Sequence, residues 1–181
     1  MAKLRAASAY RRIKRANTRT SRKKKKGFVR GVPTVRVVMF DVGGKKKWNE
    51  FPMQVDLVAR KTLQIRDNAL EAGRQTATRQ MDFVAGKTNW YMKIKAVPHQ
   101  IVREKPLASG AGADRFSQGM GHGHGKPYGH AAPVKPGKVI MSIYCHKDHV
   151  LGAKEALRKA QSKMPLRCQR IVKDSEFYQK A

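Results

Sequence analysis

The sequence predicts an α+β fold, a two-layer sandwich of two helices on a mainly antiparallel sheet. Two segments carry small and apolar residues at the spacing of a helix, and several shorter segments alternate as strands do. Most strands follow one another along the chain with few helices between them, which favours antiparallel pairing. We therefore expect one α+β domain over residues 35–173.

Two strands are predicted ahead of the first helix. Residues 35–40 (VRVVMF) form a β-branched run, and the DVGG that follows them is typical of a turn. Residues 53–59 (MQVDLVA) alternate with a period of two, which indicates a half-buried strand.

Small and apolar residues recur at spacings of three and four along the next segment. They are Leu70, Gly73, Ala77, Met81 and Val84. The spacing predicts a helix over residues 61–84, with Thr62 as its N-cap and Gly86 as its stop. Because the stripe is narrow and rich in small residues, we expect this helix to pack closely on the sheet.

Residues 90–97 (WYMKIKAV) return to the period of a strand. One face carries Trp90 and the apolar residues after it, and the other carries Tyr91, Lys93 and Lys95. Aromatic and lysine side chains on one strand face are typical of a platform that stacks bases and contacts phosphates. A solvated strand face is an equally good interpretation.

The remaining elements follow the same two periods. Residues 99–104, 138–145 and 166–172 are predicted strands, and a frayed tail is expected over 174–181. Between the last two strands, apolar residues spaced three and four apart predict a second helix, with Asp148 as N-cap and Pro165 closing it. Its apolar residues are Val150, Ala153, Leu157, Ala160 and Met164.

Charge dominates the composition. The chain carries 40 Lys and Arg against 12 Asp and Glu, a net charge of +28. Such a chain repels itself and favours a polyanionic partner, most commonly nucleic acid. No apolar run of about 18 residues and no secretory signal is present, so no membrane partner is expected. Two cysteines make neither a disulfide framework nor a zinc set, which indicates a reducing, intracellular compartment.

The first 34 residues form a basic N-terminal arm without an acidic residue. Lysine and arginine clusters of this kind bind phosphates and release counterions, which predicts an arm that binds RNA or DNA. A transit peptide and a solvated basic tail are the alternatives. The candidate phosphate-binding residues are Arg11, Arg12, Lys14, Arg15, Arg22, Lys23, Lys24, Lys25, Lys26 and Arg30.

Residues 105–136 are predicted to form a long exposed loop. Seven of the chain's 15 glycines lie in residues 109–133, where large apolar side chains are few. Such a segment cannot bury a core, and we expect deletion of residues 108–129 to leave the domain folded. Glycine lets the backbone approach a phosphate or a base closely, so the loop is interpreted as a second RNA-contacting element.

Metal binding and catalysis are weaker interpretations. His122 and His124 could hold a transition metal together with His130 or His146, but flanking glycines make that loop costly to order. No phosphate-binding loop, nucleophile with an oriented base, or spaced carboxylate pair is recognisable. We therefore expect no enzyme, no cofactor and no metal.

Several motifs together resemble one family, the archaeal L-ten-e form of the L-sixteen proteins of the large ribosomal subunit. The motifs span nearly the whole chain in the family's order. They are YRRIK at 10–14, FVRGVP at 28–33, DNALEA at 67–72, GAGADR at 110–115, GKP at 125–127 and KEALR at 154–158. Residues 120–125 (MGHGHG) also resemble the MGKGKG of bacterial members, with histidine in place of lysine.

The resemblance implies a hammerhead-type α+β domain in cytoplasmic ribosomes, without catalytic residues of its own. The implied partners are large-subunit (23S-type) rRNA, neighbouring large-subunit proteins and the acceptor end of A-site tRNA near the peptidyl-transferase centre. It places the arm in rRNA and the internal loop beside the tRNA. The loop residues concerned are Gly110, Gly112, Asp114, Arg115, Met120, His122, His124 and Lys126. A free-standing DNA- or nucleoid-binding protein is the alternative function.

Overall fold

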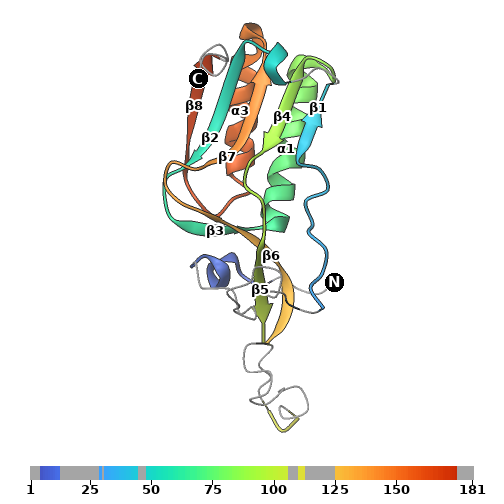
Figure 1. The fold of residues 1–181 in the computed structure, drawn as a ribbon, viewed down its shortest axis with the longest axis vertical. Helices are drawn as coiled ribbons and strands as arrows, with labels where there is room; N and C mark the ends of the chain where they lie inside the picture. The colour runs from blue at the N-terminus through green and yellow to red at the C-terminus, as the bar shows by residue number, and fades with distance from the viewer. Residues whose placement is uncertain are drawn as a thin grey trace, which may run out of the picture.

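The computed structural model describes residues 5–12, 29, 31–44, 48–105, 110–112 and 125–174. Over these residues the predicted α+β class is confirmed, with two α-helices and strands that pair only in antiparallel fashion (Figure 1). The strands form two sheets rather than one. No helix in the described part of the chain combines the length and apolarity needed to cross a membrane.

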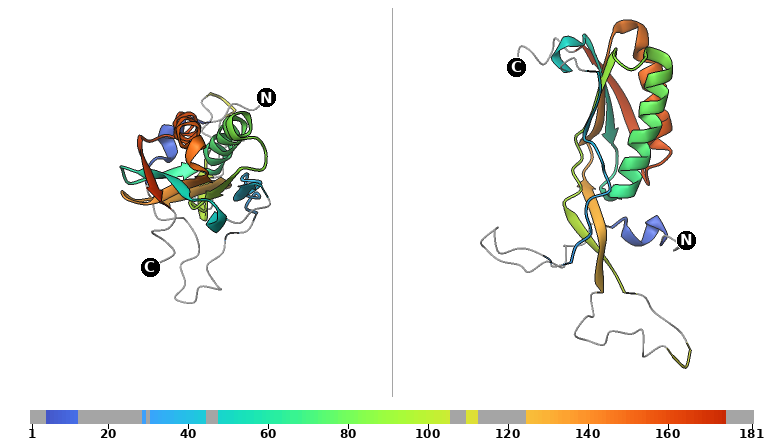
Figure 2. Two further views of the ribbon diagram at one scale, coloured as in Figure 1. Left: turned by 90° about the horizontal axis from the view of Figure 1, so that it is seen from above. Right: turned by 90° about the vertical axis from the view of Figure 1, so that its right-hand side faces the viewer.

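The larger sheet has five strands and carries both helices on one face (Figure 2). In spatial order the strands are β1 (Asp41–Gly43), β4 (Trp90–Ile94), β7 (Val139–Cys145), β2 (Met53–Ala59) and β8 (Cys168–Asp174). The helices are α1 (Asp67–Ala85) and α3 (Val150–Gln161). Their apolar faces and the covered sheet face enclose the main core.

Small residues let the two helices approach each other. A Cβ atom on Gly73 would lie 3.5 Å from the Ala160 carbonyl oxygen of α3, 3.0 Å from Met164 Cε and 3.4 Å from Met141 Cε, so a larger residue would displace the methionine side chains. The predicted stripe of α1 is confirmed at Leu70, Gly73, Ala77 and Met81, all buried. Val84 is exposed and Ala85 is buried instead.

The start of the first helix was predicted wrongly. Residues Leu63–Arg66 form strand β3, and α1 begins at Asp67 with Arg66 rather than Thr62 at its N-cap. Leu63 and Ile65 alternate with polar residues and are both buried, which suits a strand. The predicted end is confirmed, because Gly86 takes a positive φ of 74° at the C-cap.

The predicted loop over residues 105–136 is also shorter than expected. Strand β6 (Lys126–Val134) occupies its second half and pairs with β3 on one side and β5 (Gln100–Glu104) on the other. Gly129 and Ala131 are buried within this three-stranded sheet. The predicted bounds of the loop are therefore wrong, and the deletion of residues 108–129 would also remove the first part of a central strand.

Residues 35–40 are not a strand. The backbone N–H groups of Arg36 and Val38 donate to carboxylates of α1, Asp67 Oδ2 and Glu71 Oε2, each at 3.2 Å. These bonds hold the segment as an extended connection along the helix. The strand lies instead at β1, in the residues predicted to turn.

The other predicted elements are present with shifted ends. Strands β4, β5 and β7 match the expected segments, and β8 begins at Cys168. Strand β2 is buried on both faces rather than half-buried. Helix α3 follows a short 3-10 turn (η5, Lys147–His149), so His149 rather than Asp148 is its N-cap, and it ends at Gln161, before Pro165.

Part of the basic arm belongs to the folded body. Residues Ala7–Tyr10 form a 3-10 helix, η1, and Tyr10 is buried against Val102 and Ala131 of the three-stranded sheet. This contact forms a second, smaller core at the base of the β5–β6 hairpin. The sequence predicted an arm over residues 1–34 that is separate from the domain. Residues 7–10 of that arm instead pack on the domain.

Both cysteines are free. Burial raises the pKa of the Cys145 thiol and of the Cys168 thiol to about 11 each. Because the reactive species is the thiolate, both side chains act as apolar residues of the sheet.

Candidate nucleic-acid interface

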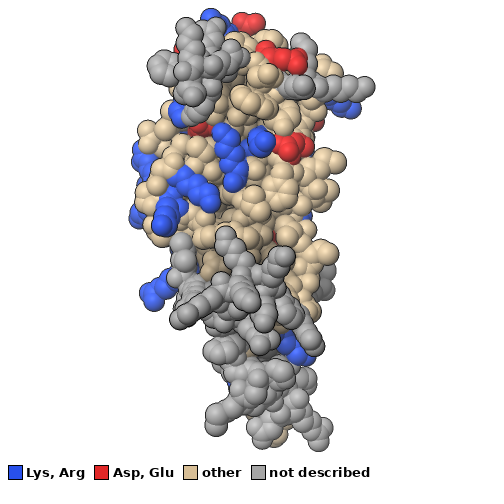
Figure 3. All heavy atoms as spheres, in the orientation of Figure 1, with Lys and Arg blue, Asp and Glu red and all other residues tan. Residues whose placement is uncertain are grey.

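The first candidate surface is the face of the five-stranded sheet that the helices leave uncovered. Residues paired directly across neighbouring strands point to the same face. The register places Tyr91 beside Tyr144 of β7, and Lys93 beside Ser142. Figure 3 looks onto this side of the molecule and shows more basic than acidic side chains over its middle and one edge.

Aromatic rings gather at one end of this open face. The ring centroids of Tyr91 and Tyr144 are 6.0 Å apart, and those of Trp48 and Tyr144 are 5.8 Å apart. Tyr144 is buried, whereas the Trp48 side chain on the 3-10 turn η3 (Trp48–Glu50) is 41% exposed. The sequence predicted the tyrosine of β4 but missed Trp48 and Tyr144, because their contact depends on strand order.

Asp41 of β1 constrains the predicted platform residues. Its Oδ1 accepts a hydrogen bond from the Tyr91 hydroxyl at 2.7 Å and lies 3.8 Å from Lys93 Nζ. The ion pair is exposed, so it stabilises the fold little. The hydrogen bond from the Tyr91 hydroxyl orients the ring, and the ion pair keeps Lys93 beside it. Lys95, two residues further along, is half-buried.

Replacement of Asp41 by asparagine is expected to lower the pKa of Tyr91. This pKa is raised from its ordinary value of 10 to about 12. Burial of the hydroxyl is the larger cause, and the hydrogen bond to the Asp41 carboxylate is the second. A raised phenol pKa stabilises the fold below pH 10, and the contribution disappears as pH rises towards 12. Ultraviolet titration of phenolate would measure the shift, with Tyr91→Phe identifying the signal. An unchanged titration in Asp41→Asn would contradict the contact.

A buried polar network lies on the same face of the sheet, between strands β7 and β2. Asp56 of β2 is fully buried, and its Oδ1 accepts hydrogen bonds from Gln54 Nε2 at 2.5 Å and Ser142 Oγ at 2.6 Å. Asp56 Oδ2 lies 3.4 Å from Lys173 Nζ. The carboxylate therefore anchors a lysine on the open face.

The second candidate surface is the described part of the N-terminal arm. Gln64 of β3 donates from its backbone N–H to the Arg11 carbonyl at 3.0 Å and from its side chain to the Arg12 carbonyl at 2.8 Å. These bonds fix the backbone and leave both arginine side chains exposed. Lys14, Arg15, Arg22, Lys23, Lys24, Lys25, Lys26 and Arg30 lie outside the described residues.

Two stacked tyrosine rings, each with an arginine guanidinium over it, hold the arm to the β5–β6 hairpin. The rings of Tyr10 and Tyr128 are stacked with an interplanar angle of 4° and centroids 6.2 Å apart. Arg66 lies over Tyr10 at 5.5 Å, and Arg36 lies over Tyr128 at 5.8 Å. Arg36 and Arg66 were missed, since neither stands in a basic cluster and only the fold brings them to these rings.

The third candidate surface is the projecting end of the β5–β6 hairpin (Figures 1 and 2). Lys126 is exposed where β6 begins, opposite Glu104 of β5. Gly110 and Gly112 are exposed. Asp114, Arg115, Met120, His122 and His124 lie outside the described residues. The three candidate surfaces thus occupy separate places along the long axis of the molecule.

Gly125 closes the base of the predicted loop, and Gly125→Ala is expected to destabilise the hairpin. Its φ is +80°, and an added Cβ would lie 2.4 Å from the Glu104 carbonyl oxygen. Strain of this kind costs about 1–3 kcal/mol. Urea unfolding of the full chain would measure it. Gly112→Ala is the control, because a Cβ there meets nothing within 4 Å; equal stability of the two variants would contradict the expectation.

The described residues contain no group of three metal-ligating side chains. His130 points its Nε2 at the Pro33 carbonyl at 2.9 Å, and His146 packs against Phe51 with ring centroids 5.4 Å apart. Both side chains therefore have structural contacts away from each other. The other two histidines of the predicted set, His122 and His124, lie outside the described part of the chain.

Comparison with known proteins agrees with the motifs. The family model for ribosomal protein L16p/L10e matches residues 16–171. The large ribosomal subunit protein uL16 of Archaeoglobus fulgidus is 47% identical over 159 residues, which cover 88% of this chain and 87% of that protein. The uL16 of Methanococcus aeolicus is 40% identical over 170 residues, 93% of this chain and 94% of that protein. The chain therefore belongs to the ribosomal protein L16p/L10e family.

Proposed function

We propose that this chain is a structural constituent of the large ribosomal subunit that binds large-subunit rRNA. Family membership over most of the chain is the observation that carries the proposal. The net charge of +28 supports it, because a protein so basic needs a polyanion to offset its self-repulsion. The hammerhead-type arrangement implied by the family resemblance remains a prediction of the same proposal.

The basic arm and the open sheet face supply the proposed rRNA contacts. Arg11 and Arg12 have fixed backbones and exposed side chains, so they lose little backbone freedom when they contact phosphates. On the sheet, Tyr91 and Lys93 offer a ring and a cation side by side. The basic residues at 14–30 extend the same chemistry along the arm.

The hairpin supplies the proposed contact with tRNA. Strands β5 and β6 project away from the helix-covered five-stranded sheet, at one end of the molecule (Figure 1), and most of the Gly-rich residues stand between them in the sequence. We propose that residues 110–126 line the path of aminoacyl-tRNA to the A site, near the peptidyl-transferase centre. Peptide-bond chemistry is assigned to rRNA, and neighbouring large-subunit proteins are the expected protein partners.

Sedimentation of cell extracts tests the proposal. The full-length chain is expected to travel with the large ribosomal subunit and to remain there through a moderate salt wash. Binding of any polyanion would be salt-dependent, so the salt dependence alone does not distinguish RNA from DNA. Sedimentation with nucleoid DNA, in place of the subunit, would contradict the proposal and support the free-standing DNA-binding alternative.

A further inference from the structure

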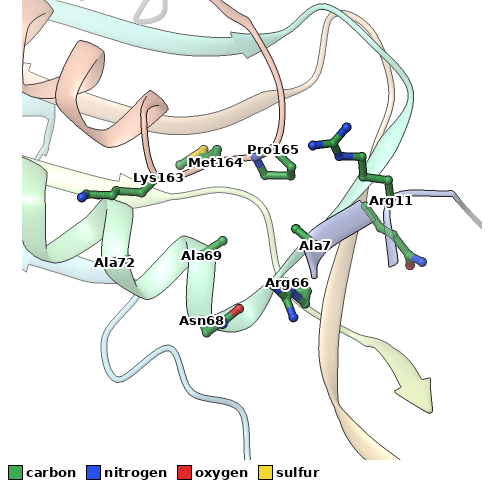
Figure 4. A pocket seen from close by; sticks show the side chains of 10 residues that line it. Ala7, Arg11, Arg66, Asn68, Ala69, Ala72, Lys163, Met164 and Pro165 are labelled. Carbon is green, nitrogen blue, oxygen red and sulfur yellow. The ribbon is translucent and has the colours of Figure 1, made fainter. Parts of the chain in front are cut away.

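A pocket of about 310 Å³ lies where the arm, β3, the start of α1 and the turn after α3 meet (Figure 4). This volume is at the lower limit of pockets that bind small molecules. Its described lining contains no carboxylate. The lining residues are Ala7, Arg11, Gln64, Arg66, Asn68, Ala69, Ala72, Lys163, Met164 and Pro165.

Three cations from three different segments border the pocket. Arg11 comes from the arm, Arg66 from the end of β3 and Lys163 from the turn that follows α3 (Figure 4). Arg66 donates to the Arg5 carbonyl at 2.9 Å, whereas the Arg11 and Lys163 side chains are exposed. The first turn of α1 also begins here, but the buried Asp67 carboxylate already accepts the Asn68 backbone N–H at 2.8 Å, so the exposed Arg11 and Lys163 are the groups that favour an anion. The electrostatics select a negatively charged ligand.

Two of the lining residues carry a buried acceptor atom without a hydrogen bond. Gln64 is 6% exposed, and its Nε2 donates to the Arg12 carbonyl, which fixes the amide with Oε1 turned the other way. Gln64 Oε1 and Asn68 Oδ1 are buried and accept no hydrogen bond within the described part of the chain. A buried acceptor without a donor is unfavourable. A ligand that brings N–H groups would therefore be stabilised here.

We propose that this pocket binds one unpaired nucleotide of RNA, with its phosphate at the cations and its base inside. The proposal rests on the proposed rRNA-binding function. An exocyclic amino group of the base donates to Gln64 Oε1 or Asn68 Oδ1, and the apolar side chains Met164 and Pro165 contact the base. An inorganic anion would satisfy the cations but leave the two acceptors unpaired. A nucleotide supplies an anion for the cations and an N–H donor for at least one of the two acceptors.

Titration of the full-length chain with three small probes tests the base contact. The first probe is AMP. The second is the purine ribonucleotide that differs from AMP only in lacking the exocyclic amino group, and the third is ribose 5-phosphate, which lacks the base. By two-dimensional NMR, AMP is expected to shift the side-chain amide resonances of Gln64 and to bind about fivefold more tightly than the amino-free purine nucleotide. Equal affinity for all three probes, or a Gln64 amide that does not respond to AMP, overturns the proposal.

Variants separate the two halves of the pocket. Asn68→Ala should weaken binding of AMP but not of ribose 5-phosphate, whereas Lys163→Gln should weaken both by a similar factor. Lys154→Gln removes an exposed lysine of α3 that does not line the pocket, and it should change neither. Gln64 is left intact because it also holds the arm. If Lys154→Gln weakens binding as much as Lys163→Gln, only general charge is at work and the proposal fails.

Large subunits distinguish an rRNA nucleotide from a free one. In subunits that carry Asn68→Ala, one rRNA adenine or cytosine is expected to gain reactivity towards dimethyl sulfate relative to wild-type subunits. AMP binding without such a change overturns the assignment to RNA. Sedimentation of the wild-type chain with the subunit is scored separately. A failed pocket test with normal sedimentation refutes only this inference, whereas failed sedimentation refutes the proposed function.

Discussion

Asp56→Ala is expected to lower the free energy of unfolding by about 3 kcal/mol. The substitution removes the acceptor shared by Gln54 and Ser142 and the counterion of Lys173. Gln54 and Ser142 are buried, so water cannot replace the lost partner without entering the sheet. The Lys173 side chain is 34% exposed and recovers part of its hydration, which limits the loss.

Urea unfolding of the full-length chain measures this loss as a lower midpoint at an unchanged slope. Asp56→Asn keeps an acceptor at the same place, and its stability should fall between wild type and Asp56→Ala. Asp148→Ala is the matched control. Its side chain is exposed, and the N-cap position of α3 belongs to His149, so a change within about 0.5 kcal/mol is expected. Equal losses at Asp56 and Asp148 would show that the network contributes nothing.

Replacement of residues 106–124 by an Asn-Gly turn is expected to slow accommodation of aminoacyl-tRNA by roughly tenfold or more while the domain stays folded. The two cut ends are adjacent, because Glu104 pairs with Lys126 and Gly125 lies against Glu104. A two-residue turn joins such strands. The deletion spares β6, unlike a deletion over residues 108–129, which would cut into Lys126–Gly129.

Accommodation would be followed by rapid kinetics on ribosomes that carry the shortened chain, with urea unfolding of the isolated chain alongside. A second variant that restores the original length with Gly and Ser separates the effect of length from that of the side chains. Accommodation at the wild-type rate in the shortened chain would refute the tRNA contact. A loss of stability as large as that of a core substitution would refute the view that the segment carries no core.

Elements with strong local periods were predictable. The stripe from Leu70 to Met81 and the alternation of Trp90, Met92 and Ile94 match buried faces, because a burial pattern repeats with the geometry of its own element. The errors at β3 and β6 share one cause. Each strand is the other's partner, and β6 contains Pro127, Gly129 and Pro133, which by themselves favour turns. Pairing between distant segments overrides that local preference.

The candidate interface was predictable where it depends on composition or on a single strand, and not where it depends on the order of the strands. Composition and basic clusters predicted a nucleic-acid partner, and the motifs predicted the family, which the comparisons confirm. Tyr91, Lys93 and Lys95 were assigned to one face of a strand. The register places Tyr91 and Lys93 on the face away from the helices, whereas Lys95 follows the end of β4. Asp41, Trp48 and Tyr144 were not assigned, because they join that face only through the order β1-β4-β7.

By itself, the sequence determined the charge of +28, the α+β class, most of the apolar stripe of each helix and the family, since each of these depends on residues close together or on totals. The tertiary structure decided the second sheet, the burial of Tyr10 and Asp56, and the pocket between Arg11, Gln64, Asn68 and Lys163. These features join residues that are far apart along the chain. Their proximity depends on the path of the whole backbone, which no local period encodes.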